Sequence, residues 1–136
     1  MSIKRKITMA TGKRKTAVAR VRVTDGEGRV RINNVPIIIH EPQMARDMIV
    51  EPMLIAAEAV SKVDIQIETS GGGPLAQAAA ARMGLAQGLV KHTKSKRLKS
   101  AFLEYDRTML SGDERRKEAK KFGGPGARRR KQKSYR

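Results

Sequence analysis

Hydrophobic side chains recur at every second position in the first third of the chain. Between residues 17 and 23 the small and branched apolar residues occupy the odd positions, and Val30 and Ile32 repeat the pattern after the loop 24–28. Such alternation is typical of a half-buried β-strand. The Asp-Gly pair within the loop favours a turn between paired strands. The pattern therefore predicts a β-hairpin.

The arginines that alternate with these apolar residues would share the other face of the hairpin. They are Arg20, Arg22, Arg29 and Arg31. Four guanidinium groups on one small face suit a phosphate surface. A later stretch, residues 63–69, alternates in the same way with Asp64 and Glu68 at even positions. If it lies beside the hairpin, its carboxylates would pair with the arginines and give an ordinary sheet surface instead. The residues alone leave both interpretations open.

Spacings of three and four residues predict helices elsewhere. Apolar residues between positions 44 and 49 mark one helical face, and Pro52 is expected to interrupt that helix and to open a second one. A helix rich in alanine and glycine is expected at Leu75–Val90, and its small side chains permit close packing on the sheet. Shorter helices are expected at about Lys96–Leu103 and after Ser111. These elements indicate an α+β fold, a small mixed sheet of about four strands with helices packed on it.

Gly71, Gly72 and Gly73 separate the strand 63–69 from the long helix. A strand, a glycine turn and a helix N-terminus present free backbone N–H groups, and the helix dipole adds positive potential, so an anion can bind there. The loop lacks the spacing of a nucleotide P-loop, and Thr11-Gly12-Lys13-Arg14 does not complete one. Taken alone, the loop fits a tight turn at least as well as a phosphate site.

Charge separates the body of the chain from its ends. The 136 residues contain 30 Lys plus Arg against 13 Asp plus Glu, a net charge of +17, which repels itself unless a polyanion is near. The first acid is Asp25, and none follows Glu118. We expect one globular domain with a basic N-terminal start, residues 1–118, and a long extended basic tail, residues 119–136, that is too polar to fold alone.

The tail carries its cations on both sides of a Gly-Gly-Pro-Gly break. Sixteen residues from Lys121 onward, if extended at about 3.3 Å each, would reach about 50 Å from the body. The tail would suit a path along phosphates, although a solvated disordered tail or a localisation signal is the alternative. Its cations before the final arginine are Lys120, Lys121, Arg128, Arg129, Arg130, Lys131 and Lys133.

Other function classes are disfavoured by the composition. The chain has no cysteine, which excludes disulfides, zinc knuckles and thiol catalysis. Aromatic residues make up only 3%, which argues against a stacking platform for single-stranded bases. We expect no cofactor, no metal, no secretory signal and no membrane association. His40 and His92 lie far apart, with no cysteine and no second histidine near either, and are interpreted as structural or surface residues rather than ligands. No carboxylate cluster or phosphate loop is evident, so we expect no enzymatic activity.

Three separated motifs resemble one known family. They are the run from Gly12 to Val21, the three glycines with Gln77-Ala78 and Arg82, and the ending Lys131-Gln132-Lys133-Ser134-Tyr135-Arg136. In order and over nearly the whole chain, they resemble the universal small-subunit ribosomal protein family uS9. The ending and the run Phe122–Arg128 are similar to its archaeal and eukaryotic cytosolic branch, and the short length suggests an archaeal source. Ala76 stands where many relatives carry glycine.

The resemblance implies a ribosomal S five domain-two-like fold in the head of the small subunit, in the cytoplasm. Its implied partners are small-subunit rRNA, P-site tRNA and neighbouring head proteins, and it is not a homo-oligomer. The tail would end at the P-site tRNA, with the Arg136 guanidinium near anticodon-loop phosphates. The predicted tRNA-binding residues are Lys133, Ser134, Tyr135 and Arg136. Charge and resemblance together predict the rRNA-binding residues Lys13, Arg14, Lys15, Arg20, Arg22, Gly71, Gly72, Gly73, Lys120, Lys121, Arg128, Arg129, Arg130 and Lys131.

Two other classes remain as alternatives. A free basic RNA chaperone or DNA-binding protein would share the charge but would not require a defined tail end. A ribonuclease P-like RNA-processing subunit has a related fold, but catalysis would need a carboxylate cluster. Glu104 and Asp106 flank Tyr105 with no further acid nearby and are interpreted as surface residues.

Overall fold

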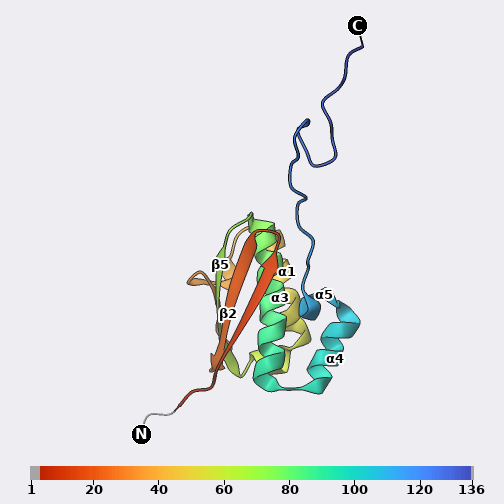
Figure 1. Cartoon of the computed structure of the whole chain (residues 1–136). Helices are drawn as coiled ribbons and strands as arrows, with labels where there is room; N and C mark the ends of the chain where they lie inside the picture. The colour runs from red at the N-terminus through yellow and green to blue at the C-terminus, as the bar shows by residue number, and fades with distance from the viewer. Residues whose placement is uncertain (1–3, 136) are drawn as a thin grey trace.

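The computed structural model describes residues 4–135 (Figure 1). Within them one mixed sheet contains β1 (Ile7–Arg14), β2 (Ala17–Asp25), β3 (Val30–Ile32), β4 (Val35–Pro36) and β5 (Val63–Ser70). The helices are η1 (Ile37–Ile39), α1 (Gln43–Ile55), α2 (Ala57–Val60), α3 (Pro74–Thr93), α4 (Lys96–Tyr105) and α5 (Thr108–Ser111). The strand order is β1-β2-β5-β3-β4, with β3 and β5 parallel and the other neighbours antiparallel. The α+β fold with a mixed sheet is confirmed.

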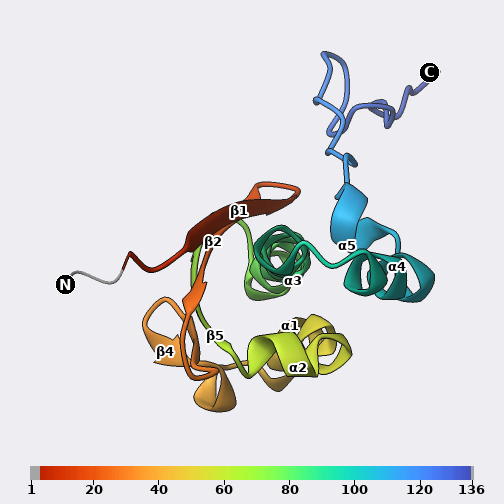
Figure 2. The same ribbon diagram turned by 90° about the horizontal axis from the view of Figure 1, so that it is seen from below.

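The helices cover one face of this sheet and leave the other bare (Figure 2). The alternation of the strands sets this division, because the odd positions 17–23 of β2 and 63–67 of β5 are buried and most of the even ones are exposed. Val21, Val23 and Ile67 pack beneath α3 and α1, where Leu85 and Ile49 complete the core. The arginines at even positions therefore lie on the face that no helix covers.

The predicted hairpin between residues 17–23 and 30–32 is wrong, because β5 lies between β2 and β3. β5 is antiparallel to β2 along eight residue pairs, from Val18 opposite Ser70 to Asp25 opposite Val63. That longer ladder satisfies many more backbone groups than the three-residue β3 alone could. The chain leaves β2, passes around the start of β5 and returns on its far side.

Asp64 holds this passing loop in place. Its Oδ1 accepts hydrogen bonds from the backbone N–H groups of Glu27 at 2.9 Å and Arg29 at 3.1 Å. These two bonds hold the pKa of the Asp64 carboxyl below its usual value. A Cβ on Gly26 would lie 2.2 Å from the Asp64 carboxyl carbon, so glycine lets the loop approach this anchor. The Asp-Gly pair thus serves a wide loop rather than a tight hairpin turn.

The actual hairpin joins β1 to β2 through a two-residue turn at Lys15 and Thr16, where Lys15 has a φ of 53°. The sequence pattern does not predict β1, whose last two residues are Lys13 and Arg14. Its large apolar residues, Ile7 and Met9, lie on the exposed face, while Ala10 and glycine face the core. The usual signal of a strand, bulky residues facing inward, is therefore absent from β1.

Two helix boundaries also differ from the sequence expectation. Pro52 does not end α1, because its ring is buried in the core and the helix continues to Ile55, with the Ala56 N–H bonded to the Pro52 carbonyl. The helix expected after Ser111 instead ends there. Gly112 adopts a φ of 80°, which stops α5, and residues 113–135 contain no helix or strand. The division of the chain at residue 118 remains a prediction.

Small residues bring α3 into direct contact with β1 and β2. A Cβ on Gly12 would lie 1.9 Å from the Ala80 carbonyl oxygen and 2.6 Å from the Gly84 nitrogen. A Cβ on Gly84 would in turn lie 2.8 Å from the Val21 Cγ2. No side chain fits between these backbones, so the helix lies closer to the sheet than larger residues allow.

We predict that Gly12→Ala destabilises the domain by about 1–3 kcal/mol or more, because the added methyl forces α3 away from β1. Gly73→Ala is the matched control, since a Cβ there meets nothing within 4 Å and its φ is −98°. Urea unfolding followed by circular dichroism measures both variants. Equal unfolding midpoints for the two would contradict the packing argument.

Candidate nucleic-acid interface

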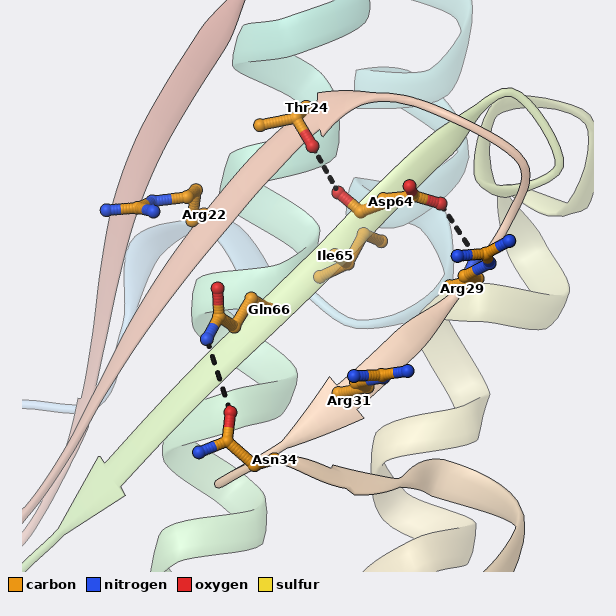
Figure 3. A pocket seen from close by; sticks show the side chains of 8 residues that line it. All are labelled: Arg22, Thr24, Arg29, Arg31, Asn34, Asp64, Ile65 and Gln66. Carbon is orange, nitrogen blue, oxygen red and sulfur yellow. Dashed lines mark hydrogen bonds between the residues drawn. The ribbon is translucent and has the colours of Figure 1, made fainter.

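Three arginines line a shallow hollow of about 250 Å³ on the bare face of the sheet (Figure 3). Arg22 belongs to β2 and Arg31 to β3, and Arg29 immediately precedes β3. Register places Arg22 opposite Gln66 of β5, and Gln66 opposite Arg31. Because neighbouring strands are about 4.8 Å apart, the Cα atoms of Arg22 and Arg31 are about 10 Å apart with an amide between them.

The residue of β5 that lies opposite each arginine differs from one arginine to the next. Arg20 lies opposite the carboxylate residue Glu68, although the two side chains form no ion pair. Arg22 lies opposite an uncharged amide, and among residues 4–135 neither it nor Arg31 takes part in an ion pair. Arg29 bonds Glu27 at 3.0 Å, an exposed pair of small energetic value. The hollow therefore presents two guanidinium groups that have no ion-pair partner in the described part of the chain, although Asp64 also lines it.

A second basic group lies at the turn between β1 and β2. Lys13 and Lys15 are exposed and make no ion pair with another described residue. Arg14 differs, because its side chain is only 22% exposed and its Nη1 bonds the Asp113 carboxylate. The structure thus separates the three residues of this motif into two exposed lysines and one arginine held by the protein.

The glycine loop packs against this same turn. Gly71 and Gly72 have φ values of 73° and 64°, and a Cβ on Gly71 would lie 2.5 Å from the Thr16 carbonyl oxygen. Both glycines are therefore required by the turn itself. Gly73 is not, since its φ is −98° and the space around it is open. It is the N-cap of α3 and no side chain caps that end of the helix.

Gln77 braces the loop from the first turn of α3. Its Nε2 donates to the Gly71 carbonyl at 3.1 Å, and its Oε1 accepts from the Thr69 hydroxyl at 3.2 Å. The Thr69 backbone N–H donates to the Asn33 Oδ1 at 3.0 Å, which ties the end of β5 to the turn after β3. The sequence motif included Gln77 but gave no sign of Asn33, which lies 36 residues from its partner.

Asp113 ties the start of the C-terminal segment to β1. Its carboxylate, 9% exposed, accepts from Arg14 of β1 and, at 2.8 Å, from Arg115 Nη2. One turn of chain earlier, the Gln87 Nε2 donates to the Leu110 carbonyl at 3.1 Å. The basic tail therefore leaves the domain beside the lysines of the β1–β2 turn.

Residues 112–135 contain no helix or strand and run away from the domain (Figure 1). Glu118 bonds Lys121 at 3.2 Å and Arg128 at 3.0 Å, and the Lys131 N–H donates to the Gly123 carbonyl at 2.9 Å, so this part doubles back. An extended path for the tail stays a prediction. The other predicted tail contacts are exposed, and they are Lys120, Arg129, Arg130, Lys133, Ser134 and Tyr135. Arg136 lies outside the described residues.

Arg82, although part of the resemblance, lies apart from these groups. It bonds Glu51 of α1 at 2.7 Å and Asp106 at 2.9 Å, and so joins α1, α3 and the end of α4. The interpretation of Asp106 as a plain surface residue is wrong. Burial acts to raise the pKa of its carboxyl, but hydrogen bonds from Thr108 and Arg82 outweigh that effect and lower the pKa.

Of the two alternatives, structural or surface residue, the structure shows the first for His92. It is 7% exposed and its two ring nitrogens bond Asp25 at 2.9 Å and Thr8 at 3.0 Å. Within residues 4–135, no three acidic or histidine side chains gather as a metal site requires. No helix in the same range is both long and apolar enough to cross a membrane.

We predict that Asp113→Asn loosens the root of the tail, because it leaves the half-buried Arg14 without its carboxylate. If the free energy of local opening falls by about 1.4 kcal/mol, the amide hydrogen exchange rate in α5 rises about tenfold. The sheet amides should be unchanged. Glu114→Gln removes a neighbouring exposed carboxylate that forms no ion pair with any residue between 4 and 135, and it is the matched control. The same exchange rates in both variants would show that the Asp113 contact does not hold the tail.

Comparison with known proteins agrees with the three motifs. A family model described as "Ribosomal protein S9/S16" matches residues 12–136. The chain is 51% identical to "Small ribosomal subunit protein uS9" of Methanothrix thermoacetophila and 52% identical to that of Halobacterium salinarum, in each case over 96% of this chain and 99% of the relative. Identity to the protein of the same name from Desulfurococcus amylolyticus is 48%, over 100% of this chain and 97% of the relative. The chain belongs to the uS9 family of small-subunit ribosomal proteins, in its archaeal type.

Proposed function

We propose that this protein is a structural constituent of the small ribosomal subunit in the cytoplasm, where its body binds rRNA and its tail reaches the P-site tRNA. The observation that carries the rRNA part is the bare sheet face, on which Arg22 and Arg31 stand in one row without a carboxylate partner. Guanidinium groups match phosphate oxygens through two parallel hydrogen bonds. A face that stays uncovered by the protein's own helices is available to a large polyanion.

The β1–β2 turn and the glycine loop supply a second rRNA contact at the end of the sheet. Lys13 and Lys15 provide charge, and the open N-terminus of α3 provides backbone N–H groups at Gly73 and beyond. Because Gly73 has no structural need to be glycine, the free space beside it fits the close approach of an RNA backbone. Arg14 contributes its positive charge, and its ion pair with Asp113 also fixes the point where the tail leaves the domain.

The tail role rests on its chemistry and on family membership. Its cations follow one another with little apolar surface, so neutralisation by phosphate is what would order them. Arg129, Arg130 and Lys131 would contact rRNA along the way. Lys133, Ser134 and Tyr135 would hold the end of the tail, so that the Arg136 guanidinium meets phosphates of the tRNA anticodon loop.

The rival functions have less support. The matched family is one of ribosomal structural proteins and not of enzymes, and we propose that this chain has no catalytic role. A free RNA chaperone or DNA-binding protein would use the same charge. It would not need a tail anchored by Asp113 at a defined point of the body, nor a particular C-terminal residue.

We predict that Arg22→Ala with Arg31→Ala weakens binding to a transcript of small-subunit rRNA and lowers the salt dependence. Loss of two phosphate contacts reduces the slope of log affinity against log salt by about two. The matched control is Lys96→Ala with Lys99→Ala, which removes the same charge from exposed positions of α4. If both pairs change the slope equally, the sheet face has no special role.

We predict that deleting Tyr135 and Arg136 leaves assembly into the small subunit nearly intact but weakens P-site tRNA binding and reading-frame maintenance. Only the end of the tail would touch tRNA, whereas the body holds the rRNA. Filter binding of tRNA to purified subunits and a frameshift reporter measure the two effects. Lys99→Ala, which also removes one cation, is the control. Equal tRNA binding by the truncated and full-length forms would remove the role assigned to Arg136.

A further inference from the structure

One continuous part of this basic protein has the opposite charge. Residues 32–61, which form β4, η1, α1 and α2, contain four carboxylates and one Lys or Arg, a net charge of −3. The other residues contain 29 cations and nine acids, a net charge of +20. The phosphate backbone of RNA is therefore attracted to the rest of the molecule taken as a whole and repelled by this part.

The single cation of this part is turned toward the protein itself. Arg46, in the first turn of α1, donates from Nη1 to the Ile38 carbonyl of η1 at 2.9 Å. This bond also brings the start of α1 against η1. The acidic and exposed residues of this part are Glu41 and Asp47, close in sequence to Arg46, and Glu58 in α2.

Large apolar side chains are exposed on the same part. Ile38 is 79% exposed, Ile39 and Met44 are each 64% exposed, and Leu54 is 72% exposed. Val35 of the edge strand β4 adds to them at 38%. Since Arg46 joins η1 to the first turn of α1, the two isoleucines and Met44 lie near one another. We name the part at η1 and the start of α1 the acidic apolar face, made of Val35, Ile38, Ile39 and Met44 with Glu41 and Asp47.

The chemistry of the acidic apolar face selects one kind of occupant. Covering exposed aliphatic groups with another apolar surface is favourable, and a ribose-phosphate backbone offers little such surface. The acids around them require cations on the partner. Strand addition is disfavoured, because β4 is two residues long and one of them is Pro36. The partner that fits is a protein that docks by side chains.

We propose that the acidic apolar face docks a second, different protein of the same ribonucleoprotein assembly, one with apolar side chains surrounded by Lys and Arg. The inference rests on the proposed function, since only an assembly of basic proteins on RNA supplies such a neighbour at fixed position. In register, Pro36 lies beside Arg31, so the protein contact begins where the arginine hollow ends. The arginine hollow would thus contact RNA, and the acidic apolar face would contact protein.

The test places a photoactivatable amino acid at position 39 of the tagged chain and, in a separate variant, at position 22, in purified salt-washed small subunits. Irradiation should join position 39 to one basic protein, identified by mass spectrometry, and position 22 to rRNA. Ile38→Ser with Ile39→Ser should then weaken binding of that purified protein at least tenfold. Leu103→Ser with Tyr105→Ser, exposed apolar residues outside the face, should leave its affinity unchanged.

The outcomes separate this inference from the proposed function. Cross-linking of position 39 to rRNA, to an acidic protein, to a second copy of this chain or to nothing overturns the inference when position 22 still reaches rRNA. Equal affinity losses in the two serine pairs overturn it as well. If the chain does not enter the small subunit at all, the proposed function fails and the inference fails with it.

Discussion

The contact between α3 and the hairpin of β1 and β2 is the constraint on which the rest of the structure depends. Gly12 lies against the Ala80 carbonyl and the Gly84 nitrogen so closely that a single methyl group has no space. Gly88 repeats the contact one turn later, where a Cβ would lie 3.1 Å from the Val23 Cγ2. Because α3 packs this closely on one face of the sheet, the other face remains available for partners.

The same contact places the functional groups. The N-terminus of α3 lies at the glycine loop, the loop lies against Thr16 of the β1–β2 turn, and Asp113 reaches Arg14 at the end of β1. The lysines of the turn, the helix N-terminus and the root of the tail therefore meet at one end of the domain. A shift of α3 relative to β1 would move all three together, so fold stability and the geometry of the interface are coupled.

The sequence predicted which side chains of β2 and β5 face inward, because their alternation states it directly. It did not predict β1, whose bulky residues Ile7 and Met9 lie outside, nor the insertion of β5 between β2 and β3. Pairings of distant segments leave no local pattern, and the bond between Arg14 and Asp113 spans 99 residues. The arginine row could be predicted from the alternation. That Gln66, and not a carboxylate, lies opposite Arg22 follows only from the strand register.

The division of charge and the family membership lead to one central claim, that this chain is held in the small subunit as a resident protein. The most direct test expresses a tagged copy in its source cell and sediments the lysate through a sucrose gradient at high salt and low magnesium. Loose electrostatic binding is screened under these conditions. The account predicts one copy per small subunit after the wash. Release of the protein to the top of the gradient would contradict it.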